Sequence, residues 1–324
     1  MEMEQQLRYR AWAEIDLSAL EHNVRTVQAM LPKQTAYMAV VKANAYGHGD
    51  KAICQKLWEL GVRWFAVSNL EEALSVRKYC PYGEIFILGY TPPEFAPELA
   101  RNNIIQGVLS LSYAQQLLSF AHQPVRCHIK LDTGMGRIGF RSDSPEDCAR
   151  ALLPLFDLEK LSIEGIYTHF AVADSPEAED MAYTQGQEDF IVAVYDKLAE
   201  MGHTLKHLHF MNSAASVTRP NPRATLARIG IIMYGLEPNY PVHVPMELPA
   251  QRGFSRENCG AGCLHQLWQN LSRSGAARHC HGHHWLCGRL CPAAFQPGIS
   301  TGARHCLPHC GTGVHGSADA GCDR

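Results

Sequence analysis

The chain has 324 residues, with 29 Lys and Arg against 32 Asp and Glu and a formal net charge of −3. That near balance argues against a general nucleic-acid-binding protein, which would carry a basic excess. Apolar residues make up 46% and charged residues 19%, which excludes a disordered chain. No apolar run approaches the length of a membrane-spanning helix, and residues 1–6 lack the features of a signal peptide, so we expect a cytoplasmic protein that binds no membrane.

Short β-rich runs alternate with amphipathic stretches over residues 8–245. The predicted strands are 35–42, 64–67, 85–88, 104–108, 125–131, 163–168, 207–211 and 225–229. Helical periodicity is clearest in 17–31 after a capping Asp16, and again in 117–121 and 190–201. The alternation predicts an α/β fold of the TIM type, a (β/α)₈ barrel. A doubly wound open sheet is the competing arrangement, but no glycine-rich dinucleotide fingerprint follows the first strand.

The first predicted strand ends at Lys42, which is followed by the segment ANAYGHG (43–49). In a barrel, functional residues lie at the carboxyl ends of the strands. A lysine that closes an apolar strand can lose hydration, which lowers the pKa of its amine and suits it to Schiff-base chemistry. The alternative is a surface lysine whose charge extends into solvent.

Four later strand ends also carry polar residues. Arg137 lies among glycines in 134–139, a tight loop that can present a guanidinium to an anion, although a solvated arginine is the alternative. His169 follows the sixth strand, where a histidine is either catalytic or structural. Asn212 and Ser213 follow the seventh strand and can bind a phosphate or cap a helix. The eighth strand ends in the segment Arg228, Ile229, Gly230 and Ile231, at a position where barrels often bind phosphate.

Together these segments resemble alanine racemases, a family that depends on pyridoxal 5′-phosphate. The segment VKANAYGHG (41–49) is similar to the family's cofactor-attachment segment, and WAEIDL (12–17) is similar to its start. Further similar segments are KLDTGMGRIG (130–139), YTHF (167–170), the pair at 212–213 and RIGI (228–231). The resemblance covers about residues 8–245, which we assign to a pyridoxal-phosphate-binding barrel.

The resemblance implies a role for each site residue. Lys42 would hold the cofactor as an aldimine and serve as one of two acid–base groups that interconvert L- and D-alanine. The cofactor-binding residues would be Lys42, Tyr46, Asn212, Ser213, Arg228, Gly230 and Ile231. Among them Arg228 would face the pyridine nitrogen, and Tyr46, Ser213, Gly230 and Ile231 would hold the phosphate. Arg137 would lie near the substrate carboxylate and His169 near the ring. Lys130 matches a position that is carbamylated in some relatives, and no metal is expected at the site.

One part of the family pattern is missing. In alanine racemases the second base is a tyrosine from the C-terminal β domain of the partner subunit in a homodimer. This chain has no tyrosine after Tyr240. Racemisation needs a proton removed from one face of the α-carbon and returned to the other. We therefore expect little or no racemase activity and a compromised dimer, and a non-catalytic cofactor-binding protein is the alternative.

Residues 246–324 differ in composition from the rest of the chain. They hold 8 of the 12 Cys and 8 of the 17 His, but no Lys and no Tyr. The groups at 280–287 and 305–310 allow a zinc-binding tail with an interaction role, although their spacing is irregular. Since strand-forming residues are scarce, we expect a disordered or poorly packed tail in place of a second domain.

A shifted reading frame is a second hypothesis for this composition. Permitted codons for 266–271, 284–291 and 310–317, when read from their second base, encode SYGKTY, IGYADGYA and AARVCMDQ. These three outputs resemble second-domain motifs of alanine racemases, in the family's order and at one offset. We therefore hypothesise a frame change after about residue 245 and before Gln266, which the codons of the gene would test.

Overall fold

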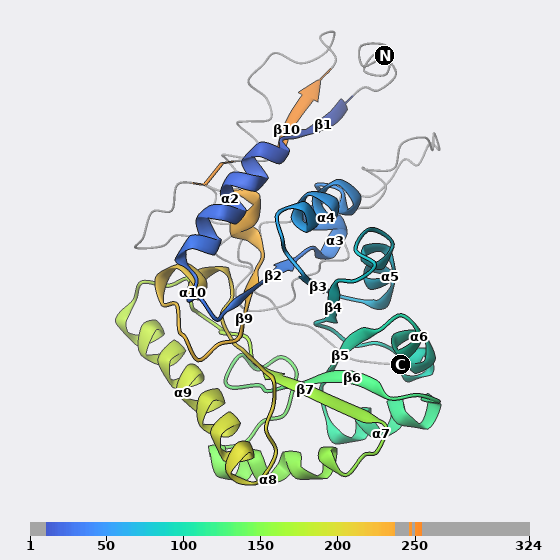
Figure 1. Cartoon of the computed structure of the whole chain (residues 1–324). Coiled ribbons are helices and arrows are strands. Elements are labelled where there is room, and N and C mark those ends of the chain that lie inside the picture. The colour runs from blue at the N-terminus through green and yellow to red at the C-terminus, as the bar shows by residue number, and fades with distance from the viewer. Residues whose placement is uncertain (1–10, 237–245, 248–249, 255–324) are drawn as a thin grey trace, which may run out of the picture. The chain divides into compact units, whose positions relative to one another are not determined.

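The computed structural model describes residues 11–236, 246–247 and 250–254, and its centre is an eight-stranded parallel sheet (Figure 1). The strands are β2 (Ala36–Val40), β3 (Trp64–Val67), β4 (Glu84–Ile87), β5 (Ile104–Val108), β6 (Val125–Lys130), β7 (Leu161–Tyr167), β8 (His207–His209) and β9 (Leu226–Ile229). They pair in the order β8-β7-β6-β5-β4-β3-β2-β9. All eight strands predicted from the sequence are present.

The two outer strands of this sheet meet and close it into a barrel. The Thr225 N–H donates to the Leu208 carbonyl over 2.9 Å, and the Arg228 N–H donates to the Met211 carbonyl over 3.0 Å. On its other side β9 pairs in parallel with β2, where Arg228 lies opposite Met38. The predicted barrel is therefore confirmed, and the open sheet is excluded.

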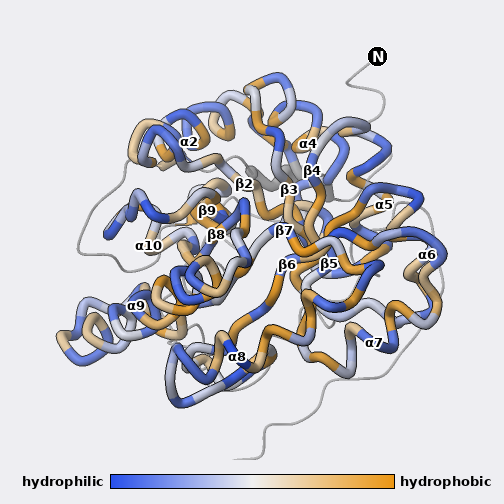
Figure 2. The backbone as a smooth tube through the Cα atoms, turned by 60° about the horizontal axis from the view of Figure 1, so that its bottom comes forward, coloured by the Kyte–Doolittle hydropathy of each residue, from blue (hydrophilic) through white to orange (hydrophobic). Residues whose placement is uncertain are grey.

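Helices surround the strands (Figure 2). They are α2 (Leu17–Met30), α3 (Lys42–Tyr46), α4 (Asp50–Glu59), α5 (Leu70–Tyr79), α6 (Ala96–Arg101), α7 (Leu111–Phe120), α8 (Pro145–Phe156), α9 (Ala178–Glu200) and α10 (Ser213–Thr218), with the 3₁₀ turns η1 (Pro93–Phe95) and η2 (Ile231–Tyr234). The predicted cap of α2 is present, because the Asp16 carboxylate accepts from the N–H groups of Ser18 and Ala19. The third predicted helix, 190–201, is the second half of α9.

Alternating side chains on the strands build two apolar layers. One face points into the barrel and includes Met38, Phe86, Ile105 and Tyr167. The other face packs against the helices, as Ala39 does between Met38 and Val40 on β2. Side chains therefore fill the barrel interior, and a ligand can approach only at its ends.

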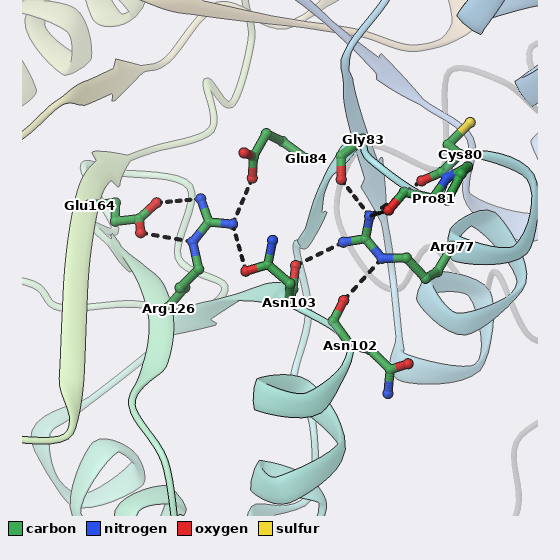
Figure 3. A network of polar contacts seen from close by, with 9 residues as sticks. All are labelled: Arg77, Cys80, Pro81, Gly83, Glu84, Asn102, Asn103, Arg126 and Glu164. Atoms are coloured by element: carbon green, nitrogen blue, oxygen red, sulfur yellow. Dashed lines mark hydrogen bonds and ion pairs between the residues drawn. The ribbon is translucent and has the colours of Figure 1, made fainter.

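Paired charges join the strands at the amino end of the barrel (Figure 3). Arg126 on β6 donates from Nε and Nη2 to the Glu164 carboxylate over 2.7 Å each, and its Nη1 lies 2.7 Å from Glu84 Oε2. Arg77 on α5 donates to five backbone carbonyls, those of Cys80, Pro81, Gly83, Asn102 and Asn103. These two arginines connect β4, β6 and β7 to the loops around them.

A separate two-stranded sheet joins residues that are distant in the sequence. The strands β1 (Ala11–Ile15) and β10 (Ala250–Phe254) pair antiparallel, with Ala11 opposite Phe254. Neither was predicted. The division of the chain at residue 245 stays a prediction, and residues 255–324, with the Cys and His groups and the shifted-frame motifs, lie outside the described residues. Within the described part, no helix is long and apolar enough to span a membrane.

Candidate active site

The turn after β2 places Lys42 at the carboxyl end of the barrel. Lys42 opens α3, and the next four residues, Ala43 to Tyr46, have φ values of 51°, 54°, 53° and 53°. Left-handed backbone costs a non-glycine residue about 1–2 kcal/mol, and strain of this kind collects at functional sites. The turn brings the partly buried Lys42 amine to 5.8 Å from the centre of the Tyr46 ring.

Three hydrogen-bonding groups converge beside this turn. The Gly230 N–H donates to Ser213 Oγ over 2.9 Å. A Cβ atom added at Gly230 would lie 3.0 Å from Tyr46 Oη and 3.7 Å from Ser213 Oγ, so the lack of a side chain lets these groups approach the Gly230 backbone closely. Ile231 begins η2 at the same place, whereas the Asn212 side chain caps α10 by accepting from the Ala215 N–H over 3.0 Å. Two hydroxyls and a backbone N–H therefore lie close together, and groups of this kind can bind a phosphate.

Arg228, two residues before Gly230, is buried and is held by backbone carbonyls. Its Nη1 donates to the His209 carbonyl over 2.9 Å, and its Nη2 donates to the Thr168 carbonyl over 2.6 Å. Burial lowers the pKa of its guanidinium to about 10, partly offset by the Tyr167 phenol. The group therefore keeps its positive charge at neutral pH in a fixed orientation.

The Arg137 loop and His169 complete the carboxyl end of the barrel. The Asp132 carboxylate shapes the loop by accepting from the N–H groups of Gly134 and Gly136, and Arg137 is exposed beyond them. In the part of the chain that the structure describes, Arg137 makes no hydrogen bond or ion pair. His169 lies with Nδ1 3.5 Å from Arg228 Nη2. Burial, followed by the charges of Arg228 and Arg137, holds the His169 pKa well below 6.5, so its imidazole is neutral.

Lys130, at the end of β6, is almost fully buried. Its Nζ donates to the Leu131 carbonyl over 2.6 Å and lies 5.5 Å from the centre of the Tyr167 ring. Burial, and then the charge of Arg228, lowers the pKa of the amine to about 7. A large share of the amine is therefore uncharged at neutral pH, and the uncharged form is the one that reacts with CO₂.

Two buried histidines, one of which contacts Arg228, lie side by side in the barrel interior. They were not predicted from the sequence. His128 Nδ1 is 2.9 Å from His209 Nε2, and His209 Nδ1 is 3.1 Å from Arg228 Nη1. Burial holds the pKa of both imidazoles well below 6.5. The available signal was a histidine within each of two predicted strands, His128 in 125–131 and His209 in 207–211.

The carboxyl end of the barrel thus collects basic side chains. Lys42, Lys130, Arg137 and Arg228 all lower the pKa of His169, so the four lie around one place. Such a concentration of positive charge favours a ligand with more than one anionic group. Among the described residues, no group of three or more His, Cys, Asp or Glu could hold a metal ion.

Comparisons with known proteins agree with this arrangement. The chain is 38% identical over 234 residues to the alanine racemase of Desulforamulus reducens. The aligned region covers 71% of this chain and 62% of that protein. It is also 34% identical over 241 residues to an amino-acid racemase of Enterococcus faecalis. Here the aligned region covers 74% of this chain and 34% of that protein. The chain therefore spans less than two thirds of the length of either relative.

The fold agrees as well. The structure superposes on the alanine racemase of Clostridium difficile 630 with a TM-score of 0.69 and 33% sequence identity, covering 75% of this chain and 64% of that one. Residues 15–238, which include every predicted site residue, match the family model described as alanine racemase, N-terminal domain. The chain therefore belongs to the alanine racemase family.

Proposed function

We propose that this chain binds pyridoxal 5′-phosphate at the carboxyl end of its barrel, in a site built to interconvert L- and D-alanine. The observation that carries the proposal is the convergence of Tyr46 Oη, Ser213 Oγ and the Gly230 N–H beside the strand that ends at Lys42. These donors fit a phosphate. The Lys42 amine, four residues before Tyr46, would bind the cofactor's aldehyde covalently.

The bound cofactor would supply an electron-withdrawing ring that makes the substrate α-carbon acidic. Arg228 would offer its N–H groups to the ring nitrogen. Because its pKa of about 10 lies well above neutral pH, Arg228 would hold its protons and leave that nitrogen without a full proton. This limits the electron withdrawal and favours return of a proton to the α-carbon over other reactions of the substrate.

Lys42 would move the proton on one face of the α-carbon, and the exposed guanidinium of Arg137 would bind the substrate carboxylate. The other face needs a second proton donor. The family resemblance assigns that role to a tyrosine of the second domain in a partner subunit, and this chain has no tyrosine after Tyr240. We therefore infer a chain that loads the cofactor but racemises alanine little or not at all, with a compromised homodimer.

The test uses the purified full-length chain. Pyridoxal 5′-phosphate is added, the complex is reduced with borohydride, and peptides are mapped by mass spectrometry, with the label expected on Lys42. Each alanine enantiomer is then incubated with the loaded chain in D₂O. Because Lys42 alone serves one face, we expect deuterium to enter the α-position of one enantiomer with retained configuration, and very slow racemisation.

The outcomes separate the alternatives. Absence of label on Lys42 would refute cofactor binding. Cofactor loading without any deuterium exchange would favour a non-catalytic cofactor-binding protein. Racemisation at a rate typical of complete alanine racemases would refute the proposed impairment.

The frame change after residue 245 stays part of the proposal. The pairing of β1 with Ala250–Phe254 supports placing it after Phe254, since those residues take up a regular register with the start of the chain. We therefore narrow the proposed interval to 255–265. Sequencing the gene tests it, because removing or adding one base in that interval must restore a frame that encodes the three motifs.

A further inference from the structure

The turn from Lys42 to Tyr46 connects the lysine proposed to bind the cofactor with the tyrosine proposed to bind its phosphate. Its backbone is left-handed at four consecutive residues, none of which is glycine. Local preferences oppose this conformation, so contacts from elsewhere in the fold must hold it. The turn matters to the site because its handedness sets where Tyr46 lies relative to Lys42.

A single carboxylate reaches into the turn from the next helix. Glu72 lies in the first turn of α5, and its Oε1 accepts from the Ala43 N–H over 2.8 Å. Its Oε2 accepts from both the N–H and the hydroxyl of Ser68, over 2.8 and 2.7 Å. The carboxylate thus ties the residue next to Lys42 to the end of the neighbouring strand β3.

The helix that carries Glu72 is itself fixed against the turn. The Glu72 N–H donates to the capping Asn69 Oδ1 over 3.0 Å. Farther along α5, the Ser75 hydroxyl donates to the Asp50 carboxylate, and the Asp50 N–H donates to Asn44 Oδ1 over 2.9 Å. The helix therefore supports the turn at Ala43 through Glu72 and at Asn44 through Asp50.

We propose that Glu72 is a positioning residue that holds the left-handed turn between Lys42 and Tyr46. The inference rests on the cofactor binding proposed above. Without the carboxylate, the turn of the cofactor-free protein relaxes away from left-handed backbone, and the two side chains lose their common orientation. Binding then has to restore the turn, so the apparent affinity falls with the fraction of molecules that still hold it.

The first experiment compares three variants of the full-length chain by titration with pyridoxal 5′-phosphate, followed by its absorbance. Glu72→Ala should weaken binding by roughly ten- to a hundredfold, the usual effect of removing a charged hydrogen-bond partner. Glu72→Gln keeps an oxygen that can accept from Ala43, so its effect should be smaller. Glu71→Ala, an exposed neighbour in the same helical turn, should bind as the unsubstituted chain does.

A second substitution separates positioning from general stabilisation of α5. Glycine adopts left-handed backbone without steric cost. Added to Glu72→Ala, the change Ala43→Gly should recover affinity by roughly two- to fivefold, because binding no longer has to restore a strained residue. In the unsubstituted chain, Ala43→Gly should leave affinity nearly unchanged, since Glu72 already holds the turn.

Hydrogen exchange of the cofactor-free chain tests the contact independently. In Glu72→Ala the Ala43 amide should exchange faster, while amides of the barrel strands keep their protection. If the unsubstituted chain binds no cofactor, both the proposed function and the positioning role toward that cofactor are refuted. Hydrogen exchange then still tests whether Glu72 holds the turn. Unchanged affinity in Glu72→Ala, or no recovery with Ala43→Gly, would overturn the inference.

Discussion

The two ends of the barrel differ in whether their charged side chains are paired with opposite charges. At the amino end, Arg126 is matched by the carboxylates of Glu84 and Glu164 (Figure 3). At the carboxyl end, Lys42, Arg137 and Arg228 form no ion pair within the residues that the structure describes. Both ends are built on the same parallel strands, so the difference lies in the side chains placed at the strand ends.

This contrast separates stability from ligand binding. Paired charges at the amino end lock neighbouring strands together, whereas clustered cations at the other end repel one another in the free protein. An anionic ligand removes that repulsion and thereby stabilises the folded chain. The difference agrees with the general rule that the amino end of such barrels supports the fold and the carboxyl end carries the chemistry.

The largest effect should come from the cation at the start of the left-handed turn. Lys42→Ala is expected to reduce borohydride-fixed cofactor from about one per chain to none, because Lys42 is the amine proposed to bind the aldehyde, whereas the nearby Lys130 amine is buried and donates to the Leu131 carbonyl. The melting temperature should change little, since Lys42 holds no strand in place. Lys51→Ala, an exposed lysine on α4, is the control. Equal labelling of both variants would show that the carboxyl end does not carry the chemistry.

The interior between the two ends should limit stability in acid. The folded-state pKa values of His128 and His209 lie well below 6.5, so below pH 6.5 the unfolded chain takes up protons that the folded chain does not. Stability present above that pH is therefore lost as the pH falls, by up to about 1.4 kcal/mol per pH unit for each histidine. Urea unfolding from pH 7 to 5 measures this loss. Because the pKa of His169 also lies well below 6.5, His128→Asn should reduce the slope by no more than about a third. An unchanged slope of unfolding free energy against pH would show that the acid sensitivity comes from other residues.

The amino end should respond in stability and not in ligand binding. Arg126→Ala leaves two carboxylates without their partner and should lower the free energy of unfolding by about 2–4 kcal/mol. Arg126→Lys keeps the charge but loses the paired geometry, so we expect an intermediate loss. Both are measured by urea unfolding, with cofactor titration alongside. Weaker cofactor binding with unchanged stability would reverse the proposed division between the ends.

A methyl group at either of two glycines gives the smallest and most local test. Gly230→Ala places a Cβ 3.0 Å from Tyr46 Oη and should weaken cofactor binding about tenfold. Gly186→Ala lies on the exposed face of α9 with open space around it, and should leave binding unchanged while stabilising the fold by about 0.5–1 kcal/mol. Cofactor titrations measure the change in binding, and thermal unfolding measures the change in stability, for both variants.

Local patterns in the sequence predicted the barrel but not every element around it. The eight barrel strands are apolar, β-rich runs between turn signals, which is a local property. Strand β1 was missed because it lies outside the barrel and pairs with residues 250–254, far along the chain. The first half of α9 was missed because it is polar and contains Gly186, so it lacks the apolar periodicity of its second half.

Some residues of the candidate site were predicted from local sequence patterns, and others were not. Lys42, Arg137, Ser213 and Arg228 were predicted because each lies at or shortly after the end of a predicted strand. Glu72 was not, since nothing in the sequence distinguishes it from any other glutamate in a first helical turn. The left-handed turn was equally hidden, because Ala43 to Tyr46 contains no glycine and contacts from α5 override its local preference.

Closure of the barrel has a consequence for the order of folding. The β2–β9 pairing joins residues 36–39 to residues 226–229, so it forms only after nearly the whole barrel has been synthesised, and its loop-closure entropy makes it a late event. Lys42 follows one of these strands, and Arg228 and Gly230 belong to the other strand and its end. A nascent or partly folded chain therefore has no complete site. The rate at which pyridoxal 5′-phosphate becomes fixed to Lys42 during refolding would time the meeting of the first and last barrel strands.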